Sequence, residues 1–157
     1  MNPDKTTPMS ILQSIAPILQ RSAVWGEKAR AIAAQIHQLR NYRWVGTTMS
    51  VRNWFQSLRI AVPVHPRTPI TKGLTGAAIR EKKTIVAADV AADPRYLTAF
   101  VTTHSKIIIP VLDENCGAVI GTIDVEASSH AFSEKDQRIL EACARESRGL
   151  WTELIPK

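Results

Sequence analysis

The sequence predicts an α+β domain, in which an antiparallel sheet of about five or six strands carries the N- and C-terminal helices packed together on one face. Three observations predict this class. Long helical patterns lie at the two ends of the chain, segments rich in β-branched residues fill the middle, and strands outnumber those of a βαβ alternation. The 157 residues suffice for one domain with a real core, and two independent domains are not expected.

The N-terminal segment, residues 10–40, is predicted to be helical, with Ser10 as its cap. Pro17 lies too far inside for a first-turn proline, so we expect a kink or break between about residues 16 and 24. The second part carries the clearer apolar stripe, formed by Ala29, Ile32, Ala33, Ile36 and Leu39.

Two strands are predicted next, at residues 42–50 and 54–62. Three prolines interrupt residues 63–75, which are therefore a loop or a sheet edge. The segment GLTG at residues 73–76 opens a short helix of roughly 76–82, and a short strand follows at 84–88.

A strand–turn–strand pattern at residues 105–126 is the most informative stretch. Two apolar runs, 107–112 and 118–125, flank a polar turn with glycine. Lys106 begins the first arm, and Asp124 and Glu126 end the second. Because these ends lie side by side in an antiparallel hairpin, one lysine and two acids are predicted to meet at one rim of the sheet, a suitable place for a small polar ligand.

The segments on either side of this hairpin complete the chain. Residues 89–104 form a long connection with one helical turn near residues 96–100. After the hairpin, Ser133 and Asp136 come close to a capping box, and the last helix is predicted to run to about residue 154. Its apolar stripe consists of Leu140, Cys143, Ser147, Leu150 and Leu154.

The charge distribution argues for helix pairing more than for nucleic-acid binding. The chain has a net charge of +6, with eight bases against two acids in residues 1–60 and nine acids against five bases in residues 113–157. No recognition-helix or zinc-finger pattern accompanies the basic half, so we expect it to lie near the acidic last helix, and binding to nucleic acid or to an acidic partner stays a further alternative.

The sequence gives no sign of a membrane segment or a metal centre. No apolar run approaches the roughly 18 residues of a transmembrane helix, and the polar N-terminus is not a secretory signal, so a cytoplasmic protein without membrane contact is expected. Cys116 and Cys143 have no C-x-x-C spacing, and His37, His65 and His130 are scattered, so neither a disulfide framework nor a metal site is predicted.

Five motifs, in this order and spacing, resemble those of a GAF domain, the small-molecule sensor fold related to PAS. They are PITKGLTG at 69–76, DVAADPRY at 89–96, SKIIIPV at 105–111, VIGTID at 119–124 and FSEKD at 132–136. The resemblance covers roughly residues 25–152. It implies an N-terminal helical extension at residues 1–24 followed by a single GAF domain at residues 25–155.

Within that superfamily the chain resembles the free methionine-(R)-sulfoxide reductases, through WVG at 44–46, the GLTG turn and IDVE at 123–126. Those enzymes attack the sulfoxide sulfur with a thiolate and resolve the adduct with a second thiol. The resemblance places the family's three cysteines at His65, Thr75 and Ala99, none of which is a thiol. No catalytic residue is therefore predicted, and a divergent reductase that uses Cys116 or Cys143 stays the alternative.

The resemblance also implies a pocket with three acids, of which this chain keeps Asp124 and Glu126 and has Lys106 in place of the third. The local formal charge changes from about −3 to about −1. Lys106 could hold an anionic group of a ligand, or it could pair with the two acids and close the site, and both interpretations stay open.

Four further residues are candidate ligand contacts. The resemblance puts an aromatic contact at Trp44, although a strand tryptophan is by default part of the core, and Thr75 lies near the mouth of the pocket. Tyr96 could close over a ligand or simply pack, and His104 lies beside Lys106 in a loop where an isolated histidine is more often just exposed. Neither cysteine is placed for bilin attachment, so no cofactor is expected.

We therefore expect a stand-alone cytoplasmic GAF sensor that binds a small polar metabolite without catalysis of its own. Its output would pass to a separate partner protein or be carried by its own dimer state. GAF-like domains often dimerise through terminal helices, and apolar residues here suggest a homodimer or, alternatively, an intramolecular helix pair. These residues are Trp25, Ile32, Ile36, Leu150, Trp151 and Leu154.

Overall fold

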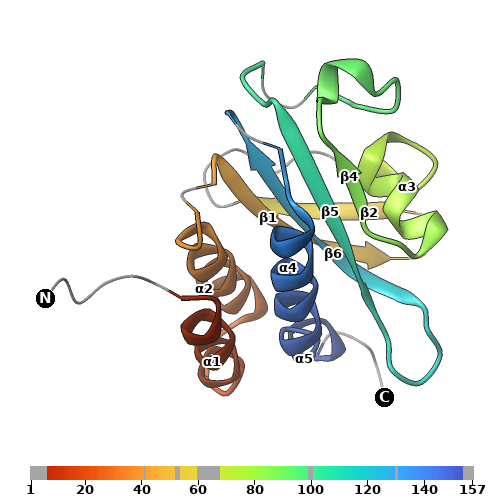
Figure 1. Cartoon of the computed structure of the whole chain (residues 1–157). Helices are drawn as coiled ribbons and strands as arrows, with labels where there is room; N and C mark the ends of the chain where they lie inside the picture. Colours follow the sequence, from red (N-terminus) through yellow and green to blue (C-terminus); the bar gives the residue numbers. More distant parts are fainter. Residues whose placement is uncertain are drawn as a thin grey trace, which may run out of the picture.

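The structure is a computed structural model that describes residues 7–40, 42–51, 54–59, 68–98, 101–129 and 131–153. Its centre is an antiparallel sheet with helices on both faces (Figure 1). Within the described residues six strands pair in the order β3-β2-β1-β6-β5-β4, which confirms the predicted α+β class. Their bounds are β1 Trp44–Val51, β2 Trp54–Arg59, β3 Thr68–Pro69, β4 Ile85–Ala87, β5 Ser105–Leu112 and β6 Val119–Ala127.

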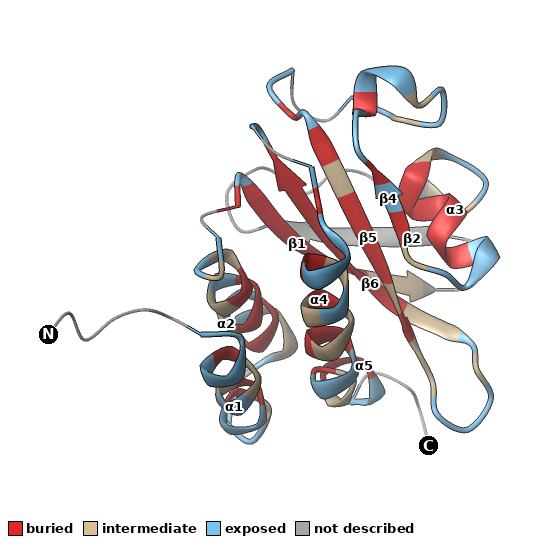
Figure 2. Cartoon of the chain, viewed as in Figure 1, coloured by how far each residue is buried: buried red, intermediate tan, exposed pale blue. Residues whose placement is uncertain are grey.

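The N- and C-terminal helices together cover one face of the sheet (Figure 1). They are α1 Pro8–Leu19, α2 Trp25–His37, α4 Glu134–Glu146 and α5 Gly149–Thr152. Their apolar stripes meet the side chains that β5 and β6 turn toward them, among them Ile107, Ile109 and Ile123, in one continuous core (Figure 2). Burial of apolar surface on this face is the main favourable term that holds the sheet and the helices together.

The first helix differs in detail from the prediction. The helix starts at Pro8, with Thr7 as its cap, and Ser10 completes a reciprocal capping box instead of serving as the cap itself. Pro17 lies in the last turn of α1, and the expected break follows it at residues 20–24. The predicted boundary between an N-terminal extension and the GAF domain, after residue 24, falls at the end of this break. The isoleucines of α1 are nevertheless buried in the same core as the apolar residues of α2 and α4.

The last helix begins as predicted but is not continuous. Ser133 and Asp136 form a capping box at the start of α4. The helix ends at Glu146, where Ser147 is the C-cap and turns its hydroxyl onto the carbonyl of Cys143 at 2.7 Å, and the short α5 follows. The indole Nε1 of Trp151 then donates to the backbone carbonyl of Thr48 at 2.7 Å, which ties α5 to β1.

Most of the apolar residues that suggested a dimer are buried within one chain. Ile32, Ile36, Leu150 and Trp151 are at most 1% exposed. Leu154 lies outside the described residues. Two ion pairs also join the basic N-terminal part to the C-terminal helices: Lys28 with Glu153, and Arg40 with Asp136, each at 2.8 Å. These contacts are those of an intramolecular helix pair, and the homodimer itself stays a prediction.

The other face of the sheet carries α3 Gly73–Glu81, which packs on β4, β5 and β6 over a second, smaller core (Figure 1). This helix begins at residue 73, three residues before the predicted start. The prediction of a helical turn near residues 96–100 is wrong for residues 96–98, which are described and are not helical. The helical turn of this connection is instead a short 3-10 helix at Val90–Ala92, capped by Asp89. Residues 60–62 and 99–100 of the predicted elements lie outside the described residues.

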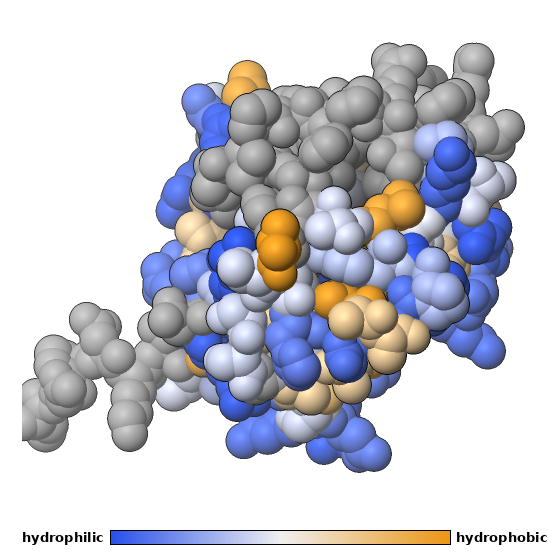
Figure 3. Space-filling model, turned by 90° about the horizontal axis from the view of Figure 1, so that it is seen from above, coloured by the Kyte–Doolittle hydropathy of each residue, from blue (hydrophilic) through white to orange (hydrophobic). Residues whose placement is uncertain are grey.

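Seen from above, hydrophilic residues make up most of the coloured surface, with single hydrophobic residues scattered among them (Figure 3). The large apolar side chains most exposed to solvent come from separate places in the chain: Met9, Val24, Val86, Leu97 and Val101. Isolated exposed apolar residues are ordinary for a protein surface and need no partner to explain them.

Candidate ligand site beneath helix α3

The β5–β6 pairing brings the predicted lysine and acids together. Lys106 lies directly opposite Glu126, and Ile108 lies opposite Asp124. Since side chains two residues apart on a strand share a face, all three charged groups project to the side of the sheet that α3 covers. The sequence prediction that these residues meet at one rim of the sheet is therefore matched by the pairing register.

The ammonium of Lys106 lies between the two carboxylates. Its Nζ is 3.3 Å from Oδ2 of Asp124 and 3.4 Å from Oε1 of Glu126. The lysine side chain is only 12% exposed, and the two acids are 4% and 1% exposed. Burial alone would lower the pKa of Lys106, but attraction to Asp124 and Glu126 outweighs it, so the pKa is raised and the lysine stays charged at neutral pH.

Threonine hydroxyls hold both carboxylates in place. Asp124 accepts from Thr122 at 2.6 Å through Oδ1 and from Thr75 at 2.7 Å through Oδ2. Glu126 accepts from Thr103 at 2.6 Å, and Thr48 lies 2.6 Å from the hydroxyl of Thr122. All four threonines are buried. The result is a fixed polar cluster of formal charge −1, which can offer a cation to an anionic group and carboxylate oxygens to a hydrogen-bond donor.

Helix α3 reaches this cluster because glycine permits a close approach at its first turn. A Cβ on Gly76 would lie 2.5 Å from the carbonyl oxygen of Ile70, which is closer than real side chains come. This packing seats the helix so that Thr75 reaches Asp124. Thr75 is the described residue at one of the three cysteine positions that the resemblance implied, and its hydroxyl is engaged as a donor to a carboxylate. The other two, His65 and Ala99, lie outside the described residues.

Trp44 lies on the same face as the charged groups. The residue pairs with Glu126 across β1 and β6, and it is 8% exposed. Its indole folds over Gly46, where an added Cβ would lie 2.0 Å from a ring carbon. The tryptophan thus forms an aromatic surface beside the acids, which is compatible with both the core role and the ligand-lining role that the sequence left open.

Tyr96 and His104 are placed differently from the three charged residues. Tyr96 is half-buried against the small core under α3. His104 is exposed, and its backbone bridges two elements: its N–H donates to Ala127 at 2.9 Å and its carbonyl accepts from Val90 at 2.8 Å. The neighbouring Thr103 is the residue that contacts Glu126.

Three threonines of the cluster were missed by the sequence analysis. Thr122 could have been found, because it precedes Asp124 by two residues and so shares its face. Thr48 required the β1–β6 register, and Thr103 lies in a loop that has no periodicity.

Neither cysteine is near the cluster. Cys143 is fully buried on α4, on the opposite face of the sheet, and burial raises the pKa of its thiol to about 11. Cys116 is exposed in the hairpin turn, beyond the far end of β5. At roughly 3.3 Å per residue, the strand from Lys106 to Leu112 alone spans about 20 Å. A thiol-based reaction at the cluster would need a different sulfur.

The described residues form neither a metal site nor a membrane-spanning helix. No group of three or more His, Cys, Asp and Glu side chains there is arranged to hold a metal ion. None of the helices in the same part of the chain is long and apolar enough to cross a membrane.

The GAF domain family model matches residues 11–147. The chain belongs to the GAF family. That match includes most of α1 and extends through α4, so both helices of the N-terminal pair fall within it.

Individual relatives of this GAF domain include both an enzyme and a protein described only by its domain. The free methionine-R-sulfoxide reductase of Saccharomyces cerevisiae is 31% identical over 75 residues, which are 47% of this chain and 41% of the yeast protein. GAF domain-containing protein A of Dictyostelium discoideum is 29% identical over 70 residues, 44% of this chain and 43% of that protein. The alignments thus span only about two-fifths of the length of these curated relatives.

Among solved structures, the free methionine-R-sulfoxide reductase of Neisseria meningitidis, in complex with its substrate, superposes with a TM-score of 0.83. The match covers 97% of this chain and 93% of that one, at 22% sequence identity. At this identity the likeness establishes the shared fold.

Proposed function

We propose that this GAF domain is a sensor that binds one small polar metabolite at the cluster of Lys106, Asp124 and Glu126, without chemistry of its own. The observation that carries the proposal is the buried lysine held between two acids under α3. Burying three charged groups is costly in free energy, and replacing such clusters by apolar residues is often neutral or stabilising. A cluster kept at that cost is better accounted for by a ligand than by stability.

The charges define the kind of ligand. An anionic group of the metabolite would take the ammonium of Lys106, and a donor group would take the carboxylates of Asp124 and Glu126. A zwitterionic or hydroxylated small acid has both. Trp44 offers an apolar surface to the rest of such a molecule, and Thr75 and Thr103 keep the acids oriented.

A thermal-shift screen with free amino acids and small carboxylates tests this proposal. We expect at least one compound to raise the melting temperature of the wild type and to lose this effect in Lys106→Glu. Lys106→Gln serves as a second variant in case the third buried acid prevents folding. Arg30→Glu, on the exposed side of α2, is the control and should respond like the wild type. Stabilisation of the same size in all variants would refute a role for the lysine.

A divergent reductase is the second candidate, because a methionine-sulfoxide reductase is among the curated relatives. The chemistry needs a thiolate at the substrate sulfur, and Thr75 has a hydroxyl that already donates to Asp124. We therefore infer that the chain does not reduce free methionine-(R)-sulfoxide. An NADPH-coupled assay with that substrate checks this: turnover that depends on Cys116 or Cys143 would overturn the inference while leaving the cluster as the binding site.

We place this sensor in the cytoplasm and propose that it works as a homodimer or through a separate output protein. Light scattering after gel filtration, with and without a stabilising ligand, tests the dimer. A mass of one chain under both conditions would exclude the homodimer and leave a separate output protein as the route of signalling.

A further inference from the structure

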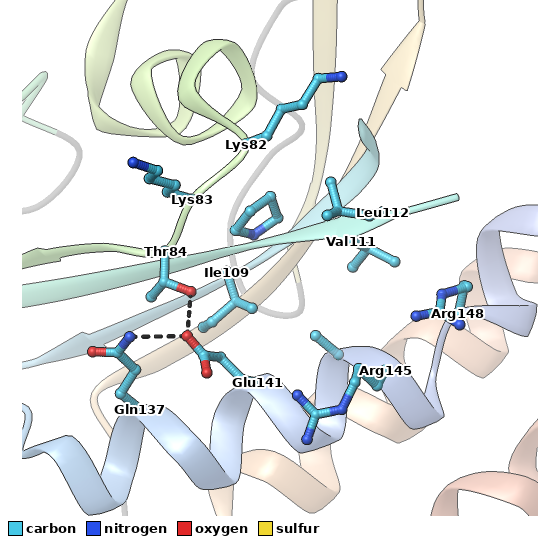
Figure 4. Close-up of a pocket in the computed structure, with 12 residues that line it drawn as sticks. Lys82, Lys83, Thr84, Ile109, Val111, Leu112, Gln137, Glu141, Arg145 and Arg148 are labelled. Carbon is cyan, nitrogen blue, oxygen red and sulfur yellow. Dashed lines mark hydrogen bonds between the residues drawn. The ribbon is translucent and has the colours of Figure 1, made fainter. Parts of the chain in front are cut away.

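A hollow lies at the outer edge of β5, beside α4 (Figure 4). Its volume is about 520 Å³, and its walls come from the turn after α3, the end of β5, the helix α4 and Arg148, which precedes α5. Pockets of roughly 300–1,000 Å³ are the usual size for small-molecule ligands.

The hollow exists because β4 is too short to cover β5. Only residues 106–108 of β5 pair with β4, so the last four residues of β5 pair with β6 alone and have no described strand on the β4 side. Helix α3 ends at its C-cap residue Lys82, which has a left-handed φ of 53°, and the chain turns there before it enters β4. Ile109, Val111 and Ala144, each at most 3% exposed, then form an apolar floor.

Four basic side chains surround this floor. Lys82 and Lys83 extend from the turn on one side, and Arg145 and Arg148 come from α4 and the start of α5 on the other (Figure 4). Within the described residues, Lys82, Lys83 and Arg145 have no carboxylate within ion-pair distance, whereas Arg148 pairs with Glu114 of the hairpin turn. Positive charge on low-dielectric walls concentrates the field inside a cleft and attracts anions.

The one acid in the lining, Glu141, offsets one of the four positive charges and leaves the hollow basic. Glu141 accepts from the hydroxyl of Thr84 at 2.7 Å and from the amide of Gln137 at 2.9 Å, which holds its carboxylate at one end of the hollow (Figure 4). The two lysines and Arg145 therefore remain available to a ligand.

We propose that this hollow binds a small organic anion that has two or more negative charges and an apolar body, such as a phosphorylated or polycarboxylate metabolite. The apolar body would lie on Ile109, Val111 and Ala144. One charged group would take Lys82 or Lys83, whose side chains extend to opposite sides of the turn (Figure 4), and another would take the planar guanidinium of Arg145, which suits the paired oxygens of a carboxylate or phosphate. The site is separate from the Lys106 cluster, whose formal charge is negative and which faces α3.

Amide chemical shifts of the ¹⁵N-labelled full chain test the proposal, with adenosine 5′-monophosphate and citrate as the phosphate and carboxylate probes at matched ionic strength. We expect saturable shifts around residues 83–84 and 144–145 with at least one probe. Lys83→Glu and Arg145→Glu should each weaken that binding about tenfold or more, since each reverses a charge in the hollow. Arg138→Glu is the control, because it makes the same reversal of charge on α4 at a side chain that is 70% exposed and does not line the hollow.

Three results would overturn the proposal: no saturable shift with either probe, shifts centred on residues 103–106, or equal weakening by Arg138→Glu. The last would mean nonspecific attraction to the basic surface. Shifts centred on residues 103–106 would assign the anion to the Lys106 cluster and so support that proposal, whereas the other two results leave the cluster untouched.

Discussion

Replacing Lys106 by methionine leaves the two carboxylates of Asp124 and Glu126 in the protein without their cation. Both acids are at most 4% exposed, so solvent compensates their charges only weakly once the lysine is gone. Removing one partner of a buried ion pair typically costs about 3–5 kcal/mol of unfolding free energy. For a chain of this size, 1 kcal/mol corresponds to roughly 2–4 °C in melting temperature, so a fall of about 6–20 °C is expected.

Urea unfolding followed by tryptophan fluorescence at pH 7 measures this loss. The control is Lys135→Met, at an exposed position on α4, which should change the unfolding free energy by less than about 0.5 kcal/mol. A loss below about 1 kcal/mol at pH 7 in Lys106→Met would refute the description of a buried, coupled cluster.

The same lysine predicts behaviour at high pH. Because its pKa in the folded chain is raised above the ordinary value of 10.5, its contribution to stability is complete below that value and is lost as the pH rises through the folded pKa. The unfolding free energy of the wild type should therefore fall more steeply above pH 10.5 than that of Lys106→Met. Parallel curves for the two proteins would contradict the direction of the shift.

Three further predictions concern the surroundings of the cluster and the thiols. Gly46→Ala should lower stability by about 1–3 kcal/mol and change tryptophan fluorescence, because the added Cβ displaces the indole of Trp44; an unchanged melting temperature would contradict this. Trp151→Phe leaves a buried carbonyl of β1 without its donor and should cost at least about 1–3 kcal/mol in urea unfolding; no loss would show that the bond is dispensable. A thiol reagent at pH 8 should titrate only Cys116 in the native chain and also Cys143 in denaturant, because burial raises the pKa of the latter to about 11; two reactive native thiols would disprove it.

The sequence was most informative where local periodicity and burial agree. Alternation of Asp124 and Glu126 with β-branched residues, and the position of Lys106 at the start of the opposite arm, predicted the charged rim that the β5–β6 register produces. The capping residues Ser133 and Asp136 predicted the start of α4 for the same reason, since the capping interaction spans only three residues.

Features that depend on distant contacts were not predictable in this way. Thr48 and Thr122 are 74 residues apart in the chain, and their contact depends on a register that no local pattern encodes. The exact helix ends were not predictable either. Helix α3 starts at Gly73, whose φ of 73° lies in the left-handed region that favours glycine, and α4 ends at Glu146 although the apolar stripe continues to Leu150.

Native mass spectrometry of the full chain, incubated with the amino-acid and carboxylate panel, tests whether a small polar ligand binds at the cluster through Lys106. We expect a noncovalent adduct on the wild type and on Arg30→Glu that is absent from Lys106→Glu and Lys106→Gln. The same adduct on all four proteins, or no adduct on any of them, would refute binding through Lys106.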